Sequence, residues 1–556
     1  MYFLRWAIWK ACEQDPTDPA IVSFITNSSY LRSVPFTGVR EHMRREFDEV
    51  WIIDLGGGGR GARKEDNVFA IQTPVAIFVG IQNPLPSATK REVSKRQKTA
   101  ATVWYRRVQG TRDDKLSALD GFLELRADDA AWTRVNDESL TDFGARFVPA
   151  GSSDFFSWPT LDVLLPWAHS GAQYTRTWPI APDAQTLRDR WDELFLTGEP
   201  DPIKFREGRD RKVTSKKSDL LTGLPMPALA SHDAVKSLLD PVRFSFRSFD
   251  RMWCLPDARL GDYLRAPLWK SFGPRQLYFT SLHATPLGAG PAMTVSAYVP
   301  DLHHFRGSYG ARDVFPAWRD PRAENPNVNR ALLDRLSAAY GETVAADALV
   351  AYVFGLLGTG AYTERFQNDL GESSPRVPIT TSHALFMEVS NFGRTLVAVG
   401  TYGERASDGQ ADEFIGTAHI VKSPRLGEYP DTFKYDPTDG TLAVGDGRIA
   451  EVLPEVWDFE VSGLKVVASW LGYRMAVKKG LSGPLDEIQP TTWAFDEELI
   501  QVLWAVEQFV RATVPAKALL ERVISGDIFR ENELPSPLPE EVAAPAPGAA
   551  TLFDGL

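Results

Sequence analysis

The glycine-rich segment at residues 56–61 most constrains the fold of this chain. It follows an apolar, strand-like run at Glu49–Leu55, and the next such run is Val75–Gln82. No helical pattern separates the two runs. Parallel strands need a crossover connection of about a dozen or more residues, usually a helix. We therefore predict that these two strands pair in antiparallel orientation.

The residues before this pair predict two helices and a third strand. Tyr2–Glu13 is expected to be helical, because Phe3, Trp6 and Ala7 recur at i, i+3 and i+4. The apolar run at Ile21–Thr26 is typical of a parallel strand buried on both faces. Phe36–Phe47 is expected to return as a helix.

This order of elements resembles the closing half of a class I methyltransferase sheet. In such a fragment the sheet is interrupted on one side, so we expect an apolar edge to be exposed there.

Four segments of different character follow from composition and periodicity. Residues 1–115 carry the α/β pattern, and residues 116–330 are rich in Trp, Pro and Arg with short strands. Residues 331–530 contain helical patterns at Ala331–Leu336, Ala345–Leu357 and Asp496–Arg511, with strand-like runs over 414–475. The acidic, Pro/Ala-rich tail, 531–556, is expected to be disordered.

Net charge argues against simple charge-driven binding to nucleic acid. The formal charge is −12, whereas phosphate contacts come from Lys and Arg, so a basic face would have to be local. Two stretches could supply such a face, although each could equally be a solvated loop. They comprise Lys90, Arg91, Lys95, Arg96, Lys98, Arg106 and Arg107, and Lys204, Arg206, Arg209, Arg211, Lys212, Lys216 and Lys217.

Neither a secretory signal nor a membrane helix is indicated. Met1–Lys10 mixes basic and aromatic residues, and the apolar run Pro74–Ile81 is well short of the roughly 18 residues that span a bilayer. We expect a cytoplasmic protein with no membrane partner.

The search for catalytic chemistry predicts no catalytic residue and no metal site. Gly56–Gly61 matches G-x-G-x-x-G, but the short, charged Ala62–Asn67 follows where a helix should open, so we interpret the segment as a hairpin loop. Cys12 and Cys254 lie far apart and are expected to be buried, apolar residues. The pair His303–His304 is interpreted as polarity in a loop.

Several sequence motifs together resemble the type ISP restriction-modification enzymes. The first part of the chain is similar to the region after their catalytic Asn-Pro-Pro motif, and the likeness continues to about residue 515. The motifs in the first part are Tyr2–Ala7, Ile25–Leu31, Val50–Gly57 and Asn67–Ile77. Those in the later part are Pro166–Gly171, Arg176–Asp183, Phe246–Arg251, Pro256–Leu260, Pro300–Phe305 and Pro375–Pro378.

This resemblance implies a partial α/β class I methyltransferase sheet, followed by an α+β target-recognition region with a helical section. It implies double-stranded DNA as partner and, for the complete adenine-N6 methyltransferase, S-adenosylmethionine as cofactor. The family's cofactor loop and Asn-Pro-Pro motif are absent, because Gln82–Pro86 lacks the paired prolines and the aromatic residue. We therefore expect the chain to be inactive alone. Three explanations stay open: a start placed too late in a longer gene, a split gene whose other chain supplies the first half of the sheet, or a decayed fragment.

The resemblance and general base-reading chemistry suggest two groups of site residues. Arg binds guanine in the major groove, and interleaved Arg and aromatic residues are common on nucleic-acid surfaces, although the same pairs also form internal stacks and ion pairs. In particular, Arg251 could pair with Asp250 or Asp257. The candidate DNA contacts are Arg176, Trp178, Arg247, Arg251, Arg259, Lys216 and Lys217.

The second group would line the pocket for adenine or cofactor, at the carboxyl end of a strand where ligands of open α/β sheets gather. For Asn27, Ser28 and Tyr30 the alternative is capping of the next turn, and for Phe69, a candidate stacking partner, the alternative is core packing. The group comprises Asn27, Ser28, Tyr30, Phe69, Gln72 and Thr73.

Two other functions stay open from sequence. One is a non-catalytic specificity or scaffold subunit of a phage-defence complex. The other, prompted by 16 Trp, is carbohydrate binding or glycoside hydrolysis, which would need two facing carboxylates that no spacing identifies.

Overall fold

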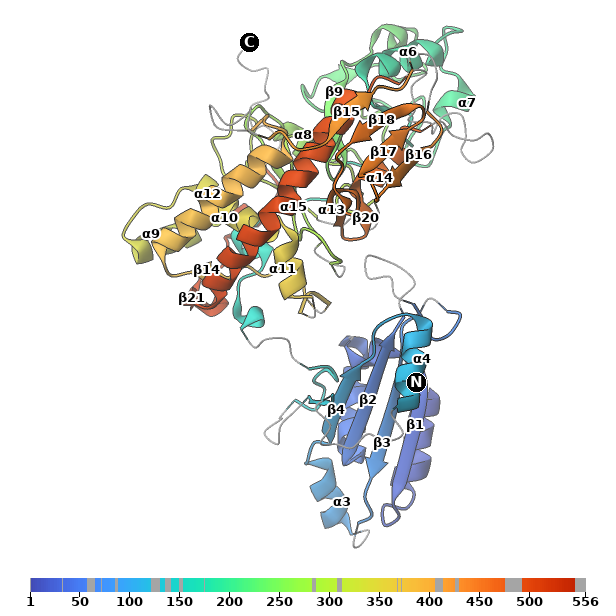
Figure 1. Cartoon of the computed structure of the whole chain (residues 1–556), viewed down its shortest axis with the longest axis vertical. Coiled ribbons are helices and arrows are strands. Elements are labelled where there is room, and N and C mark those ends of the chain that lie inside the picture. The colour runs from blue at the N-terminus through green and yellow to red at the C-terminus, as the bar shows by residue number, and fades with distance from the viewer. Residues whose placement is uncertain are drawn as a thin grey trace. The chain divides into compact units, whose positions relative to one another are not determined.

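The protein is described from a computed structural model (Figure 1). It describes residues 2–32, 34–57, 66–71, 73–85, 89–121, 131–135, 142–149, 154–174, 176–282, 287–307, 313–367, 369–371, 373–405, 414–425, 430–475 and 493–545. Contacts divide the chain into two compact units, Met1–Ser153 (unit 1) and Asp154–Leu556 (unit 2).

Unit 1 is built on a mixed sheet with strand order β1-β3-β2-β4-β5. Its strands are β1 (Ala20–Asn27), β2 (Glu49–Gly56), β3 (Val75–Gln82), β4 (Thr102–Arg107) and β5 (Thr133–Arg134). β2 and β3 are antiparallel, with Ile53 opposite Ile77, which confirms the prediction made from the glycine-rich loop. β3 also pairs antiparallel with β1, so β1 and β2 run in the same direction on either side of it.

The prediction for β1 is wrong in one respect. Within the described residues it pairs only with antiparallel β3, at the edge of the sheet, rather than lying between parallel neighbours. Its alternate side chains are exposed, including Ile21 and Ile25. An apolar run does not reveal whether a strand has one neighbour or two, because that is decided by the pairing of distant segments.

Helices flank this sheet and complete its core. α1 (Tyr2–Ile8) continues into a π-helical turn (Trp9–Glu13), as the helical pattern predicted. Phe147 and Val148 belong to the same core, so contacts extend unit 1 beyond the expected boundary at residue 115. The other helices of unit 1 are α2 (Thr37–Glu46), α3 (Lys90–Gln97) and α4 (Arg112–Asp120).

The first part of unit 2 contains small antiparallel sheets. One has the order β6-β10-β9, and another has the order β12-β11-β13. Lys217–Ser218 (β7) and Pro225–Met226 (β8) form a short hairpin. The strands of the two sheets are β6 (Ile180–Ala181), β9 (Val242–Arg247), β10 (Asp250–Cys254), β11 (Tyr278–Thr280), β12 (Thr294–Ser296) and β13 (Val314–Pro316).

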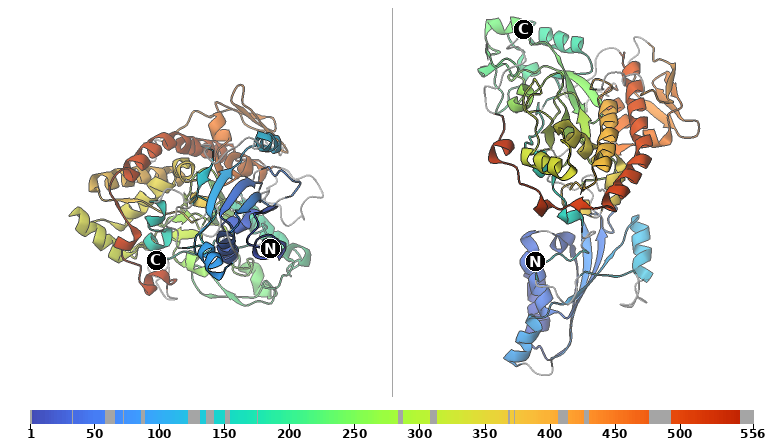
Figure 2. Two further views of the ribbon diagram at one scale, coloured as in Figure 1. Left: turned by 90° about the horizontal axis from the view of Figure 1, so that it is seen from below. Right: turned by 90° about the vertical axis from the view of Figure 1, so that its left-hand side faces the viewer.

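The second part of unit 2 is dominated by helices that share the largest core. Figure 2 and the tertiary contacts place α10 (Ala346–Leu357), α12 (His383–Gly400) and α15 (Asp496–Ile524) side by side. α9 (Arg330–Tyr340) contains the predicted helix at Ala331–Leu336, and α15 is longer than the predicted Asp496–Arg511. The smaller helices are α11 (Gly360–Arg365), α13 (Pro454–Trp457) and α14 (Val466–Gly472).

The strand-like runs over 414–475 form a four-stranded antiparallel sheet in the order β15-β18-β17-β16. The turn at 436–440 joins β16 to β17 and contains Gly440 in the left-handed region. The strands are β15 (His419–Lys422), β16 (Phe433–Asp436), β17 (Thr441–Val444) and β18 (Gly447–Ala450).

The described part of the tail, residues 531–545, differs from the expected disorder. It includes α16 (Pro539–Val542), and Leu534 is buried in the main core. Arg319 donates to the carbonyl of Glu541, and Asn329 donates to that of Pro535. Composition alone misses such anchoring, because the partners lie more than 200 residues away in sequence. The rest of the tail lies outside the described residues.

Among the described residues, no helix is both long and apolar enough to cross a membrane.

Candidate functional site

The basic stretch at 204–217 forms a surface with mixed charges. Lys204 lies 2.7 Å from Glu193, Lys212 lies 3.5 Å from Glu207, and Arg209 is 3.0 Å from Asp210. Arg209, with 84% of its side chain exposed, and nearby charges including Lys217 lower the pKa of Asp210. These acidic neighbours offset part of the positive charge, so the stretch is less basic than its Lys and Arg count suggests.

Lys216 and Lys217 differ from the rest of this stretch. They enter the β7–β8 hairpin, where Lys216 is exposed and Lys217 is half-buried. Within the described part of the chain, neither forms an ion pair at 4 Å or less. They are therefore the sequence-predicted cations best placed to meet an external anion.

Arg259 forms an internal ion pair, which is the alternative that the sequence left open. Its side chain is fully buried, and its Nη2 lies 2.5 Å from Asp257 Oδ2. Further donors bind the carbonyl of Pro227 and the hydroxyl of Ser237. The guanidinium also lies over the ring of Trp191. Because these donors are engaged inside the protein, a direct contact between Arg259 and DNA is not available in this structure.

Arg247 and Arg251 are also engaged inside unit 2. Arg247 lies 2.7 Å from Asp301 and stacks on Phe246, whereas Arg251 bonds Glu404 at 3.2 Å and stacks on Tyr402. The expected pairing of Arg251 with Asp250 or Asp257 is wrong. Asp250 binds Arg474, and Asp257 binds Arg259, so both carboxylates are already occupied. Only the tertiary fold decides between partners so close in sequence.

Arg176 and Trp178 lie in different environments. Trp178 is buried in a core that includes Leu187 and Trp191, so its ring packs inside the protein. Arg176 is half-buried. Of the pair, only Arg176 retains exposed side-chain surface.

At the carboxyl end of β1, the capping alternative is confirmed for Asn27. Its side-chain oxygen accepts from the backbone N–H of Ser29 at 2.7 Å, which caps the short 3-10 turn Ser28–Leu31. Ser28 is buried, and Tyr30 is completely buried with its ring edge against Phe78. Burial raises the pKa of Tyr30 well above its usual value. Ser28 and Tyr30 therefore support the turn from inside.

The candidates near the glycine-rich loop are only partly described. Phe69 is 43% exposed, so the expected core packing is wrong. The carbonyl of Thr73 accepts from Asn67, whose side chain also donates to Gly57. Gly57 has φ +83°, and an added Cβ there would lie 2.7 Å from Asn67. Gln72 and residues 58–65 lie outside the described residues.

A charged cluster at the carboxyl ends of β2 and β4 was missed by the sequence reasoning. Asp54 is fully buried, and its oxygens lie 3.0 Å from Arg32 and 2.7 Å from Arg107. The hydroxyl of Tyr105 donates to it at 2.9 Å. Although burial alone would raise the pKa of Asp54, Arg107 and Arg32 hold it below its usual value. Asp54 on β2 lies opposite Arg107 on the parallel strand β4. Knowledge of this strand pairing would therefore have revealed the ion pair.

Helix α1 and the edge strand β1 of unit 1 carry exposed, large apolar side chains. Tyr2 and Phe3 of α1 are 93% and 81% exposed, and Trp6 is 59% exposed. Ile21 and Ile25 of the edge strand β1 are also exposed. They point to the face of the sheet opposite to Ala20 and Val22, which share a core with α1.

One group among the described residues could offer three metal ligands, namely Glu13, His42 and Glu46. Glu13 already accepts two hydrogen bonds from Arg5, and Gln97 donates to Glu46. These protein partners account for the cluster without an ion.

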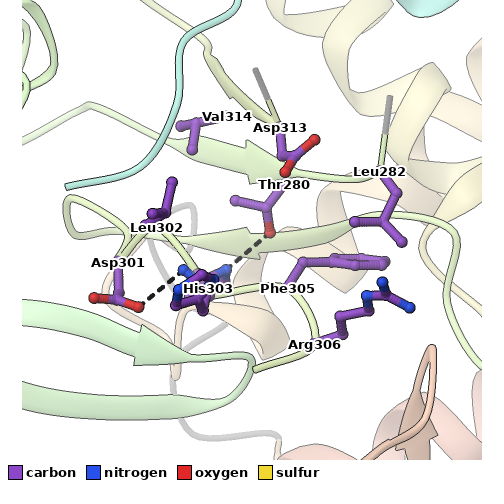
Figure 3. A pocket seen from close by; sticks show the side chains of 10 residues that line it. Thr280, Leu282, Asp301, Leu302, His303, Phe305, Arg306, Asp313 and Val314 are labelled. Atoms are coloured by element: carbon purple, nitrogen blue, oxygen red, sulfur yellow. Dashed lines mark hydrogen bonds between the residues drawn. The ribbon is translucent and has the colours of Figure 1, made fainter. Parts of the chain in front are cut away.

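The His303–His304 pair lines a small polar pocket (Figure 3). His304 is fully buried, and its Nδ1 lies 2.9 Å from the hydroxyl of Thr280. The Thr280 hydroxyl also hydrogen-bonds to the hydroxyl of Thr294, which in turn hydrogen-bonds to that of Ser248. Both histidines lie in the turn segment 301–307, as the sequence indicated. His304 belongs to a buried polar network, whereas His303 is half-buried.

The burial of His304 predicts a pH dependence of folding. Burial, with the nearby charge of Arg247, lowers the pKa of His304 from 6.5 to about 3. Below pH 6.5 the unfolded chain binds a proton that the folded chain excludes. The contribution of His304 to the free energy of unfolding is therefore fully present above pH 6.5 and falls as the pH drops toward 3. The slope is about 1.4 kcal/mol per pH unit. Between pH 7 and pH 5, wild type is expected to lose about 2 kcal/mol more than His304→Gln in urea unfolding. Equal losses would contradict the assignment.

Comparisons with known proteins identify the family of the chain. The family model described as the type ISP C-terminal specificity domain matches residues 163–503. This chain belongs to that family. The matched residues of the type ISP specificity domain include the basic stretch, the β9–β10 hairpin and helices α9 to α12. No curated protein sequence matches the chain.

Solved structures share the fold of this type ISP chain. A cryoEM structure of a DrdV–DNA complex matches with TM-score 0.56 and 17% identity, over 94% of this chain and 52% of that one. A nuclease-deletion mutant of the type ISP enzyme LlaGI, with a DNA substrate mimic, matches with TM-score 0.54 and 15% identity, over 94% and 42%. The ATP-dependent type ISP enzyme LlaBIII, bound to DNA, matches with TM-score 0.56 and 14% identity, over 95% and 36%. The chain therefore spans about half or less of each.

Proposed function

We propose that this chain performs DNA target recognition in a type ISP restriction-modification system, as the C-terminal part of an adenine-N6 DNA methyltransferase. The observation that carries the proposal is the family match, because it covers most of unit 2 with a domain described by its role in specificity. The exposed Lys216 and the half-buried Lys217 at the β7–β8 hairpin support it, since phosphate contacts hold a protein in register on the duplex.

In this proposal, different residues position the protein and read the bases. Lys216 and Lys217 make phosphate contacts, which add affinity without sequence information. Arg176 is the remaining candidate among the predicted arginines for a base edge or phosphate. Arg247 and Arg259 act indirectly, by holding the small sheets and turns of unit 2 in shape through their ion pairs.

The strand order of unit 1 supports the finer proposal of a partial methyltransferase sheet. An antiparallel strand, β3, lies between two strands of the same direction, β1 and β2, as expected for the closing half. We propose that further strands add at the free edge of β1 and cover Tyr2, Phe3 and Trp6. These strands would belong to the other half of the methyltransferase domain.

S-adenosylmethionine does not fit the described residues at this end of the sheet. Asp54 is the carboxylate at the end of β2, but Arg32, Arg107 and Tyr105 already occupy it. We therefore assign the cofactor to the completed enzyme and derive no chemical step from this chain. The alternative function is a non-catalytic specificity or scaffold subunit of a phage-defence complex.

Neutralising the two hairpin lysines is expected to weaken DNA binding and its dependence on salt. Each lost phosphate contact lowers the slope of log K against log salt by about 0.9, so Lys216→Gln with Lys217→Gln should lower it by about 2. Fluorescence anisotropy of the full chain with a labelled duplex, from 50 to about 200 mM salt, measures this slope. Lys434→Gln, an exposed lysine on β16, is the control and should leave the slope unchanged.

Two results would contradict the proposal. One is an equal change in slope for the control, and the other is no detectable duplex binding by the wild-type chain at low salt. Adding the candidate partner chain and assaying methyl transfer to adenine separates a methyltransferase part from a non-catalytic subunit.

A further inference from the structure

A cavity of about 170 Å³ lies in unit 2 between two helices and the end of a strand. α10 contributes Val350 and Ala351, α12 contributes Val397, and the residues after β13 contribute Trp318. These side chains, with Leu277, make an apolar chamber. An engineered cavity of about 150 Å³ is large enough to hold benzene, so this one can hold a single aromatic ring.

Charged groups line the same cavity as the apolar chamber. Arg394 lies 3.1 Å from Asp347, and both are partly exposed. Arg405 also lines the cavity, so the lining residues include two arginines and one aspartate. Glu404, which acts on Arg405 from outside the lining, is itself paired with Arg251. This excess of positive charge favours an anion next to the apolar chamber.

Arg405 is held by main-chain carbonyls. It donates to Gln276 at 3.1 Å and to Glu404 at 3.0 Å, and more weakly to Gly273 and Ala297. Carbonyl oxygens accept hydrogen bonds from a guanidinium but do not neutralise its charge. Burial accordingly lowers the pKa of Arg405. A planar guanidinium can also stack on an aromatic ring, which suits a ring held beside it.

We propose that this cavity is a binding site for a small, flat aromatic acid. The ring would occupy the chamber between Trp318 and the helices, and its carboxylate or phosphate would face Arg394 and Arg405. The site depends on shape and charge within unit 2 and does not rest on the proposed DNA recognition.

The test uses 4-fluorobenzoate as the probe, followed by its ¹⁹F line width, with the full chain. Ala346→Phe places a ring at the cavity wall and should abolish binding. Arg394→Gln should weaken binding by about ten-fold, the size of one lost charged hydrogen bond. Asp347→Asn removes the competing carboxylate and should strengthen binding. Arg365→Gln breaks the exposed pair with Glu521 away from the cavity and should change nothing.

The opposite responses of Arg394→Gln and Asp347→Asn distinguish a binding role from a structural one, since both break the same ion pair. The neutral analogue 4-fluorobenzamide should bind at least about ten-fold more weakly than the acid. Equal binding of the amide, or unchanged binding to Ala346→Phe, would overturn the proposal. Displacement of the probe by unlabelled benzoate but not by phenyl phosphate would identify a carboxylic acid as the ligand, and displacement by phenyl phosphate alone would identify a phosphate.

Discussion

Replacing Asp250 with Asn is expected to lower the free energy of unfolding of unit 2 by about 3–5 kcal/mol. Asp250 and Arg474 form a buried pair at 2.8 Å, and neither side chain has appreciable exposure. The substitution removes the negative charge but keeps the shape, so the buried Arg474 loses the carboxylate that lies 2.8 Å from it. Arg474 also stacks on Trp470 at 3.6 Å, which gives it no route to water without disrupting the core. Urea unfolding followed by circular dichroism measures the loss.

The matched control is the exposed pair of Arg522 and Glu388. Arg522 Nη1 lies 2.6 Å from Glu388 Oε1, and about half of each side chain is exposed. Glu388→Gln should cost less than about 1 kcal/mol, because water already solvates both charges. Asp250→Leu combined with Arg474→Met should recover much of the loss, since a buried pair can be replaced by apolar packing. A loss for Asp250→Asn no larger than that for Glu388→Gln would show that the pair is not buried as described.

Substituting Gly393 with Val should destabilise unit 2 by about 3 kcal/mol or more, at the upper end of the range for overpacking. Gly393 lies on α12 where it crosses α10, and an added Cβ would lie 1.8 Å from the carbonyl oxygen of Ala351. The neighbouring atom is backbone and cannot rotate away, so the two helices would have to separate. Gly355 faces the same crossing from α10, close to Val389.

Gly472→Ala is the control for this prediction, because nothing lies within 4 Å of the position of its added Cβ. It should leave stability within about 0.5 kcal/mol of the wild type, as most surface substitutions do. Thermal unfolding of both variants tests the contrast. Equal stability of Gly393→Val and Gly472→Ala would contradict the close helix crossing.

Local patterns identified much of the architecture. The short glycine-rich connection predicted the antiparallel pairing of β2 with β3, and apolar spacing predicted α10 and the start of α15. The motifs spread from Pro166 to Pro378 indicated the type ISP family, which the family model confirms. These signals lie within single elements or short segments, so the sequence carries them directly.

The candidate site was predicted less well, because the exposure of a side chain and its ion-pair partner depend on the tertiary structure. Arg247, Arg251 and Arg259 have the side-chain chemistry of DNA contacts, yet each is engaged inside unit 2. Sequence composition shows how many cations a chain has, whereas exposure and pairing decide which of them can meet a phosphate. Lys216 stands out only after those pairings are known.

By itself, the sequence determined the family, the types of the main elements and the antiparallel hairpin, because periodicity, loop length and motifs act over a few residues. Only the tertiary structure decided the exposure of alternate side chains on β1, the anchoring of residues 531–545 and the choice of ion-pair partners. Asp250 and Arg474 are 224 residues apart. Partners at that distance are selected by packing and burial, which no local pattern encodes.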